Sequence, residues 1–216
     1  ETEKGSQIFR PTLYDLLANR AIDYFNDDKS NIAEPSNAFS IDDKKYFNTA
    51  SEFVNIKLND ADKNSGDYNA LKIYQDLIAF KLKTRNNLDE LADADLKRLQ
   101  FVKAHYFNKD DNEILYFQAL QRIKNEYVKC NVGATINYEI ASYINQKAQD
   151  EDVLNNTFLV KDALAIIDET IKNYPNAEGA KNCAALKETI FHKDVSITLE
   201  ETVVPNEAFK MAANYK

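Results

Sequence analysis

Most of the chain repeats one pattern, in which apolar residues recur every three or four positions, as they do along one face of an α-helix. The pattern occurs in segments such as "TLYDLLANRAIDYF", "DYNALKIYQDLIAFKL", "LDELADADLKRLQFVKAHYF", "NEILYFQALQRIKNEYV", "INYEIASYINQKA" and "LVKDALAIIDETIKNY", and again over residues 176–190. A helix with one apolar stripe is stable when that stripe packs on a neighbour. The sequence therefore predicts a mainly α fold of seven to nine helices in consecutive antiparallel pairs.

The spacing also predicts which residues form the core. We expect buried stripes in four places: Leu13, Leu16, Leu17, Ala21, Tyr24 and Phe25; Leu71, Tyr74, Leu77 and Ile78; Leu88, Leu91, Ala92, Leu96, Leu99, Val102 and Tyr106; and Leu164, Ile167, Ile171, Ala180 and Ala184.

Helix ends and loops follow from polar residues and turn formers. Pro11-Thr12 is a start signal for the first helix, and Asp67 is the expected cap of the second. A further helix is expected over residues 45–58, whereas the polar stretches 27–44 and 149–158 are interpreted as loops.

Two pairs of segments read as helix, short turn, helix: "ALQRIKNEY" with "GATINYEIASYI", and "ALAIIDETIKNYP" with "AEGAKNCAALKETI". Tyr127 and Tyr174 close the first helix of each pair and lie 47 residues apart, further than the tetratricopeptide (TPR) repeat of about 34 residues. Small residues stand where helices of such repeats approach closely: Ala163, Pro175 and Ala180. The sequence therefore indicates TPR-like helical hairpins rather than strict TPR units.

After Lys193 the period changes from 3.6 to 2. Val195, Ile197 and Leu199 alternate with polar residues, and a second alternating set follows a turn at Pro205-Asn206: Phe209, Met211, Ala213 and Tyr215. A lone hairpin cannot cover its own apolar face and is marginally stable in water. Either the strands lie on the helices, or they begin a β-sandwich that continues past Lys216. The expected division is a helical-repeat domain over 1–193 and the first strands of a sandwich over 194–216.

Charge and composition narrow the classes of partner. The formal net charge is −8 and basic residues are not clustered, so we expect no nucleic-acid partner. No segment approaches the apolar length of a membrane span. Cys130 and Cys183 lack CxxC spacing and are interpreted as two separate core residues, with a disulfide as the alternative. The opening "ETEKGSQ" has no initiator Met or apolar leader and is interpreted as following a cut.

Two acidic stretches resemble functional sites. Asp60, Asp62, Asn64 and Asp67 are spaced like a calcium loop, but Ser65 and Leu71 replace the glycine and the bidentate glutamate that such a loop needs, so a solvated interhelical loop is the preferred interpretation. The second stretch, "DELADAD", contains Asp89, Glu90, Asp93 and Asp95. These carboxylates fall in the first turns of a helix, where negative charge is favoured, and capping is preferred over acid–base chemistry.

Signals for catalysis are weak. His105 and His192 have no cysteine, serine or second histidine at a useful spacing, and a packed histidine is the preferred interpretation of His105. The sequence has no GxSxG, HExxH, P-loop or dinucleotide-binding motif. We therefore assign no catalytic, cofactor-binding or metal-binding residue and no cofactor, and we expect a protein that is not an enzyme.

The ordered blocks "PTLYDLLANRAIDYF", "ALKIYQDLIAFKLK", "LADADLKRLQFVKAHY" and "YPNAEGAKNCAALKETI", followed by "VSITLEETVVPNEAFKMAANY", resemble the large bacterial alpha-2-macroglobulin-like proteins of Gram-negative cell envelopes. The resemblance runs from Pro11 to Tyr215 and matches the helical region before the first macroglobulin-type β-sandwich. It implies a periplasmic or envelope location, adjacent macroglobulin domains as partners, and a non-catalytic role in a protein that traps proteases. The thioester pattern CxEQ of some members does not occur here.

A second hypothesis is a stand-alone TPR-like adaptor whose concave face binds a peptide or partner protein. The sequence that follows residue 216 discriminates the two hypotheses, because further sandwich-length β segments favour the first and a stop codon favours the second.

Overall fold

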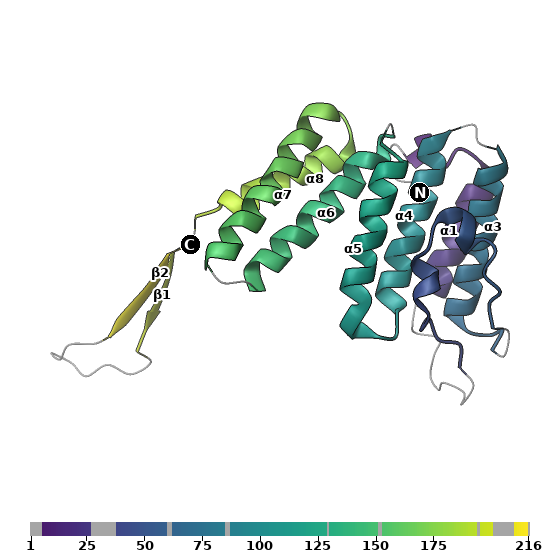
Figure 1. Cartoon of the computed structure of the whole chain (residues 1–216), viewed down its shortest axis with the longest axis horizontal. Helices are drawn as coiled ribbons and strands as arrows, with labels where there is room; N and C mark the ends of the chain where they lie inside the picture. Colours follow the sequence, from purple (N-terminus) through teal and green to yellow (C-terminus); the bar gives the residue numbers. More distant parts are fainter. Residues whose placement is uncertain are drawn as a thin grey trace.

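The computed structural model describes residues 6–26, 38–59, 62–84, 87–128, 130–150, 153–193, 195–200 and 210–215. Within these ranges it contains eight α-helices followed by one antiparallel pair of strands, so the predicted mainly α fold is confirmed (Figure 1). The elements are α1 (Leu13–Phe25), α2 (Ala50–Phe53), α3 (Gly66–Thr84), α4 (Leu88–His105), α5 (Lys109–Glu126), α6 (Val132–Asp150), α7 (Val153–Asn173), α8 (Glu178–Phe191), β1 (Val195–Leu199) and β2 (Met211–Tyr215), with short 3-10 helices at Ser6–Ile8 and Lys44–Phe47.

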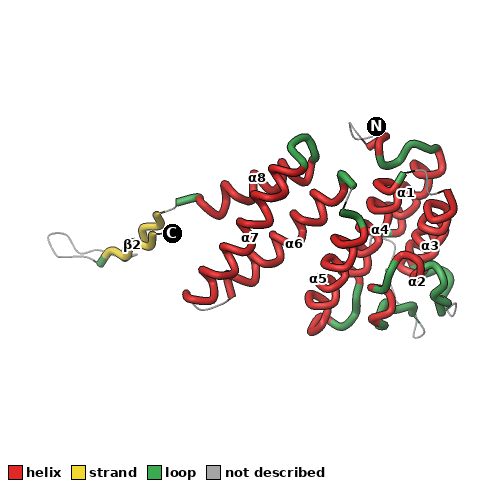
Figure 2. Tube along the Cα trace, turned by 45° about the horizontal axis from the view of Figure 1, so that its top comes forward, coloured by secondary structure: helices red, strands yellow, loops and turns green. Residues whose placement is uncertain are grey.

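From α3 onward the long helices form a row in chain order, and α1 packs beside this row on α3. α1 packs on α3, α3 on α4, α4 on α5 and α5 on α6, and α6 then packs on both α7 and α8 (Figures 1 and 2). The two hairpins expected from the sequence are α5–α6 and α7–α8. The strands extend from the far end of this row, beyond α8 (Figure 1).

Side-chain caps explain where several helices begin. The Thr12 hydroxyl accepts from the backbone N–H of Asp15, and the Asp15 carboxylate accepts from the backbone N–H of Thr12, which together form a capping box for α1. For α3 the predicted cap is wrong, because Asp67 lies inside the first turn. The Ser65 hydroxyl instead accepts from the backbone N–H of Tyr68 at 3.4 Å.

The main core lies among α1, α3, α4, α5 and the first half of α6. The predicted stripe of α3 is buried throughout, and the α4 stripe is buried except for Leu88. The spacing predicted these buried residues correctly because α3 and α4 each pack on at least two other long helices. The largest fully buried apolar side chains of these helices are Leu71, Ile78, Leu99, Tyr116, Leu120, Ile123 and Ile136.

The predicted stripe of α1 is largely wrong. Leu13, Leu17 and Tyr24 point to solvent, whereas Asp15, Ala18 and Ile22 are the buried residues of this helix. α1 has apolar residues on two opposite faces, and periodicity alone does not say which face turns inward.

The helix predicted over residues 45–58 is broken into two short pieces. The 3-10 turn Lys44–Phe47 ends at Asn48, and the capping box of Thr49 with Glu52 starts α2, after which residues 56–59 are irregular. The backbone carbonyls of this segment accept hydrogen bonds from side chains of other helices, Arg98 and Gln75 among them, in place of helical N–H groups.

The loop predicted over 149–158 is also wrong. α6 continues to Asp150 and α7 begins at Val153. The Asn156 side chain donates to the carbonyl of Ala148 at 2.6 Å, so a polar residue closes the end of α6 from within the first turn of α7. Of the other predicted loop, only residues 38–44 fall inside the described ranges, and the Ile41 carbonyl there accepts from the N–H of Phe107 at 2.8 Å.

The last three helices pack through small residues. Ile167 and Ala180 are buried as predicted, whereas Leu164, Ile171 and Ala184 are half-buried. A Cβ atom added to Gly179 would lie 2.2 Å from the backbone of Ala134, so α8 meets α6 backbone to backbone at this glycine.

The two strands pair in a regular antiparallel register. Val195 lies opposite Tyr215, Ile197 opposite Ala213, and Leu199 opposite Met211. Directly opposed residues share a face of the sheet, so Val195, Ile197, Leu199, Met211 and Ala213 lie on one face, and Thr198 and Ala212 lie on the other. Phe209, which we expected in the second strand, lies outside the described residues.

Candidate functional site

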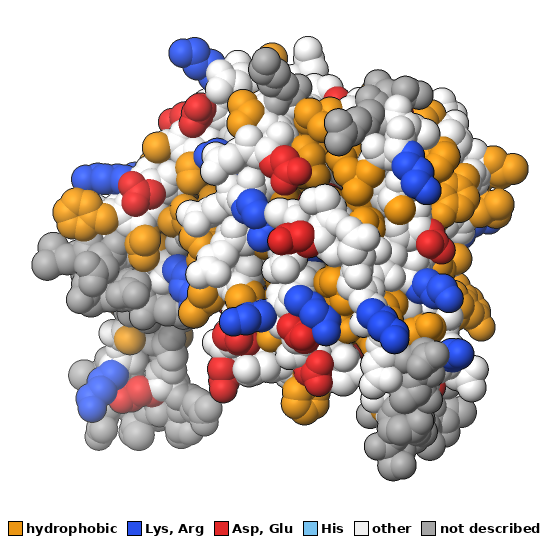
Figure 3. All heavy atoms as spheres, turned by 45° about the vertical axis from the view of Figure 1, so that its right-hand side comes forward, with side chains coloured by type: hydrophobic (Ala, Val, Ile, Leu, Met, Phe, Trp, Pro, Cys, Tyr) orange, Lys and Arg blue, Asp and Glu red, His pale blue; other side chains and the backbone are white. Residues whose placement is uncertain are grey.

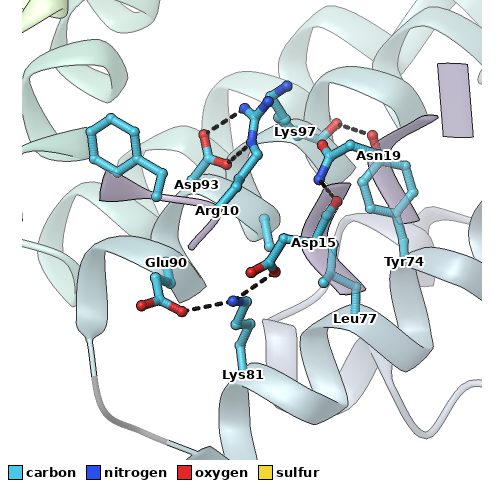
Figure 4. Close-up of a pocket in the computed structure, with 11 residues that line it drawn as sticks. Arg10, Asp15, Asn19, Tyr74, Leu77, Lys81, Glu90, Asp93 and Lys97 are labelled. Atoms are coloured by element: carbon cyan, nitrogen blue, oxygen red, sulfur yellow. Dashed lines mark hydrogen bonds and ion pairs between the residues drawn. The ribbon is translucent and has the colours of Figure 1, made fainter. Parts of the chain in front are cut away.

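A small hollow between the N-terminal segment, α1, α3 and α4 gathers more charged side chains than a helical core ordinarily holds (Figure 4). It has room for about one water molecule. Its lining consists of Phe9, Arg10, Asp15, Asn19, Tyr74, Leu77, Lys81, Glu90, Asp93, Ala94 and Lys97.

Lys81 is the centre of this hollow. Its Nζ lies 2.7 Å from Oδ1 of Asp15 on α1 and 2.6 Å from Oε2 of Glu90 on α4. The Lys81 and Asp15 side chains are almost fully buried. Each buried charge meets an opposite charge at hydrogen-bond distance, so the triad joins three helices, and removing Lys81 would leave the buried Asp15 carboxylate without its cation.

Arg10 makes a second ion pair beside the first. Its guanidinium donates from Nε and Nη2 to the two carboxylate oxygens of Asp93, at 2.9 and 3.2 Å (Figure 4). This two-pronged geometry is the strongest form of a side-chain ion pair. It joins the segment that precedes α1 to the second turn of α4.

The electrostatics of Asp15 follow from these contacts. Burial by itself raises the pKa of this carboxyl group, but the hydrogen bonds from Lys81 and Thr12 and the charge of Lys81 outweigh burial, so the pKa lies below its ordinary value. Asp15 is therefore held as a carboxylate at neutral pH, in an ion pair that is already complete.

A second charged cluster lies where residues 46–53 meet α4 and α5. Arg98 is fully buried, pairs with Asp95, and donates to the carbonyls of Tyr46 at 2.6 Å and Asn48 at 3.0 Å. The Phe53 ring lies 4.7 Å from the Arg98 guanidinium carbon. The buried cation therefore satisfies the carbonyls that the broken helix leaves without N–H partners.

Arg122 of α5 and Tyr127, the residue that caps the C-terminus of α5, complete this cluster. Arg122 donates to the carbonyl of Phe47, and the Tyr127 hydroxyl donates to Asp95 at 3.2 Å. Burial, followed by the charge of Asp95, raises the pKa of Tyr127, and burial lowers the pKa of Arg122. Neither the Tyr127 hydroxyl nor the Asp95 carboxylate reaches open solvent, so the contacts give this cluster a structural role.

The predicted capping role of the "DELADAD" carboxylates is therefore incomplete. Asp89 and Glu90 do lie in the first turn of α4. However, Glu90, Asp93 and Asp95 each pair with a cation from another turn or element. Asp89 accepts from the backbone N–H of Val132 at 3.2 Å, so it caps the start of α6.

His105 joins three helix ends. Nδ1 lies 2.8 Å from Oδ1 of Asp67 at the start of α3, and Nε2 lies 2.7 Å from Oδ1 of Asn26 after α1. The ring stacks on Phe101, with centroids 4.3 Å apart. This is the packed histidine that the sequence indicated. The other histidine, His192, is exposed beyond α8.

The remaining candidates do not come together as a site. Asp60 of the possible calcium loop lies outside the described residues, Asp62 accepts from the backbone N–H of Asn64, and Asp67 pairs with His105. Within the described ranges no cluster of three or more His, Cys, Asp or Glu side chains has metal-binding geometry.

The two cysteines are free and buried, in different apolar clusters. Burial raises the pKa of each thiol to about 11, with the charge of Asp89 adding to the effect at Cys130. Both are therefore thiols at neutral pH and poor nucleophiles.

Lys81, Arg10 and Arg98 are the central residues of the two charged clusters, and sequence reasoning missed them. A signal exists for Lys81, which follows Ile78 by three residues and Leu77 by four and so continues the apolar stripe of α3. A cation inside a core stripe indicates a buried acidic partner. The sequence does not say which of the many carboxylates that partner is.

The most conspicuous exposed feature is the apolar face of the hairpin. Val195, Ile197, Leu199 and Met211 are 54%, 60%, 53% and 60% exposed. Among the described residues the strands make their extensive contacts with each other and not with a helix. A two-stranded sheet with an exposed apolar face is typical of a segment that binds further protein.

Comparisons with known proteins give no identification: no family model, no curated protein and no solved structure matches this chain. None of the helices in the described part of the chain combines the length and the apolar character that crossing a bilayer requires.

Proposed function

We propose that the chain is a non-catalytic structural and interaction module of a bacterial alpha-2-macroglobulin-like protein of the cell envelope. Its helical array would carry the first strands of the macroglobulin-type β-sandwich that follows, and so support protease trapping by the parent protein. The division between residues 1–193 and 194–216 is part of this proposal.

The observation that carries the proposal is the hairpin. β1 and β2 expose an apolar face over both strands and leave the outer backbone edge of each strand open for pairing within the described ranges. Exposed strand edges and apolar sheet faces promote aggregation unless further strands cover them. The remainder of a β-sandwich would supply both a neighbouring strand and a second sheet for the apolar face.

The charged clusters favour a scaffold over an enzyme. Lys81, Arg98 and Asp15 are each committed to ion pairs and hydrogen bonds that join helices. A catalytic acid or base needs a neighbouring substrate and freedom to exchange its proton. These side chains lie in a hollow with room for about one water molecule or in the closed core.

The sequence of the gene downstream of Lys216 tests the proposal. Several further alternating segments of sandwich length would support it, and a stop codon directly after Lys216 would contradict it in favour of a stand-alone TPR-like adaptor. A physical test follows if the gene continues. The chain extended through the next predicted sandwich should protect the amides of Ile197 and Leu199 from hydrogen exchange, compared with the 216-residue chain. Equal exchange in both chains would count against a shared sandwich.

A further inference from the structure

The outer face of α1 is an apolar stripe exposed at one end of the helix row. Leu13, Leu17 and Tyr24 are 69%, 57% and 72% exposed. At 3.6 residues per turn they lie within about 40° of one another around the helix. The opposite face of α1 holds the buried residues Ala18 and Ile22. α1 is thus built like a helix that packs on both sides, although its extensive packing in the described chain is against α3 alone.

The position of α1 makes this exposure unusual. Each of the helices α3, α4 and α5 packs on at least two other long helices, whereas α1, the first long helix of the array, packs extensively on α3 alone. The end helix of a helical array ordinarily presents a polar outer face to keep the array soluble. On the face of the molecule that Figure 3 draws, apolar side chains are scattered among acidic and basic ones. The helix-on-helix packing of the row is therefore unfinished at α1.

We propose that the partner at this face is a second copy of the same chain, with α1 packing antiparallel on α1 of the other copy about a two-fold axis. Such an axis perpendicular to the helices makes the two α1 helices antiparallel by symmetry. The contact would continue the order of the row, in which successive helices joined by short turns run in opposite directions, as α4 and α5 do.

The stripe is complementary to itself in this arrangement. Its midpoint lies between Leu13 and Tyr24, close to Leu17. Antiparallel pairing about that point brings Leu13 of each copy to Tyr24 of the other and places Leu17 beside the axis. Aromatic and leucine side chains at helical spacing are the ordinary material of helix–helix contacts.

Charge and area also favour a second copy. The exposed charged residues of α1 are Arg20 and Asp23, which have opposite signs, so this rim does not repel its own copy even though the whole chain carries −8. Tyr14 and Phe80, whose rings lie 5.3 Å apart, extend the patch onto α3. Together these apolar side chains expose roughly 500 Å², a large share of the ~800 Å² that each partner buries in a standard interface.

Sedimentation equilibrium of the full 216-residue chain tests the proposal. Between about 1 and 200 µM, the apparent mass should rise from 24.7 kDa toward twice that value. Leu17→Glu should weaken the dimer at least tenfold, because it buries a charge beside the axis. Phe107→Glu is the matched control: Phe107 is also well exposed but follows α4, away from the stripe, and the dissociation constant should stay unchanged.

Other outcomes decide against the proposal. A wild-type chain that stays monomeric at 200 µM overturns it, as does a dimer that survives Leu17→Glu but is lost on Ile197→Glu in the hairpin. If circular dichroism shows that the Leu17→Glu chain is unfolded, Tyr24→Lys is tested in its place, and the dimer should be weakened by the same factor. Arg20→Glu gives an independent check, since it makes the rim acidic, and the weakened dimer should recover as salt screens the repulsion.

Discussion

The helices α1 to α5 and the helices α6 to α8 are held together in different ways. The first group shares a large aromatic and aliphatic core and encloses ion pairs centred on Lys81 and Arg98. The second group has a small buried cluster of Ala141, Ile167 and Cys183, with Gly179 lying against the backbone of α6. The packing of α1 to α5 depends on buried ion pairs, whereas the packing of α6 to α8 depends on the close approach of two helix backbones.

This difference predicts different sensitivities. Buried ion pairs stabilise a fold little in net terms, but they are costly to break, because the remaining charge stays buried. A close backbone contact tolerates polar changes nearby and fails when volume is added. The helices α1 to α5 should therefore lose stability when a buried ion pair is broken, and the helices α6 to α8 should lose stability when side-chain volume is added.

The largest effect is expected at Arg98. Arg98→Met leaves Asp95 buried without its cation and leaves the carbonyls of Tyr46 and Asn48 without their donor. The free energy of unfolding should fall by about 3–5 kcal/mol, measured by urea denaturation. Lys187→Met is the control, because its ion pair with Asp168 is exposed and should contribute at most about 1 kcal/mol. Equal losses of stability in the two variants would mean that the buried cluster around Arg98 does not hold the helices α1 to α5 together.

Gly179→Ala should cause the next largest loss of stability. The added methyl would lie 2.2 Å from the Ala134 backbone, so α8 must move away from α6, at a cost of about 1–3 kcal/mol. Amide exchange should rise in α8 and the first turns of α6, while α3 and α4 stay protected. Gly133→Ala is the matched control, because its nearest neighbour is the tip of the Tyr174 side chain at 3.1 Å. A neutral Gly179→Ala would show that the two backbones are further apart.

Asp15 gives a smaller effect that depends on pH. Because the folded chain holds the Asp15 pKa below its ordinary value, the unfolded chain binds more protons in the acid range. The contribution of Asp15 is complete above the unfolded pKa of about 4 and is lost as pH falls toward the folded value. Asp15→Asn should lower stability at pH 7 and flatten the acid dependence of the unfolding free energy between about pH 5 and 2. An unchanged slope would contradict the assigned ion pair.

The smallest effect is expected from removing the strands. Ending the chain after Lys193 removes β1 and β2, whose extensive contacts are with each other. The melting temperature should change by less than about 2 °C, by differential scanning calorimetry. If the truncated chain unfolds instead, the hairpin belongs to a self-contained α+β domain, and the proposed macroglobulin module loses its physical basis.

The candidate charged sites show where sequence reasoning stopped. The acidic positions Asp93 and Asp95 were singled out from the sequence, whereas the cation Lys81 was missed although it continues the apolar stripe of α3. Their partners were not, because Arg10 is 83 residues from Asp93, and the carbonyls that Arg98 binds lie about 50 residues away along the chain. Only packing brings such groups within hydrogen-bond distance.

By itself, the sequence determined the helical class, the stripes of α3 and α4 and the alternation of the terminal strands, since these depend on spacing within one segment. Tertiary structure decided which face of α1 turns inward, why the chain over residues 45–58 breaks, and that α6 and α7 extend into the polar stretch 149–158 from either end. These outcomes depend on neighbours distant in sequence. A helix with apolar residues on two faces buries the face that packs better on its neighbours. A backbone carbonyl accepts a hydrogen bond from whichever donor the fold brings near it.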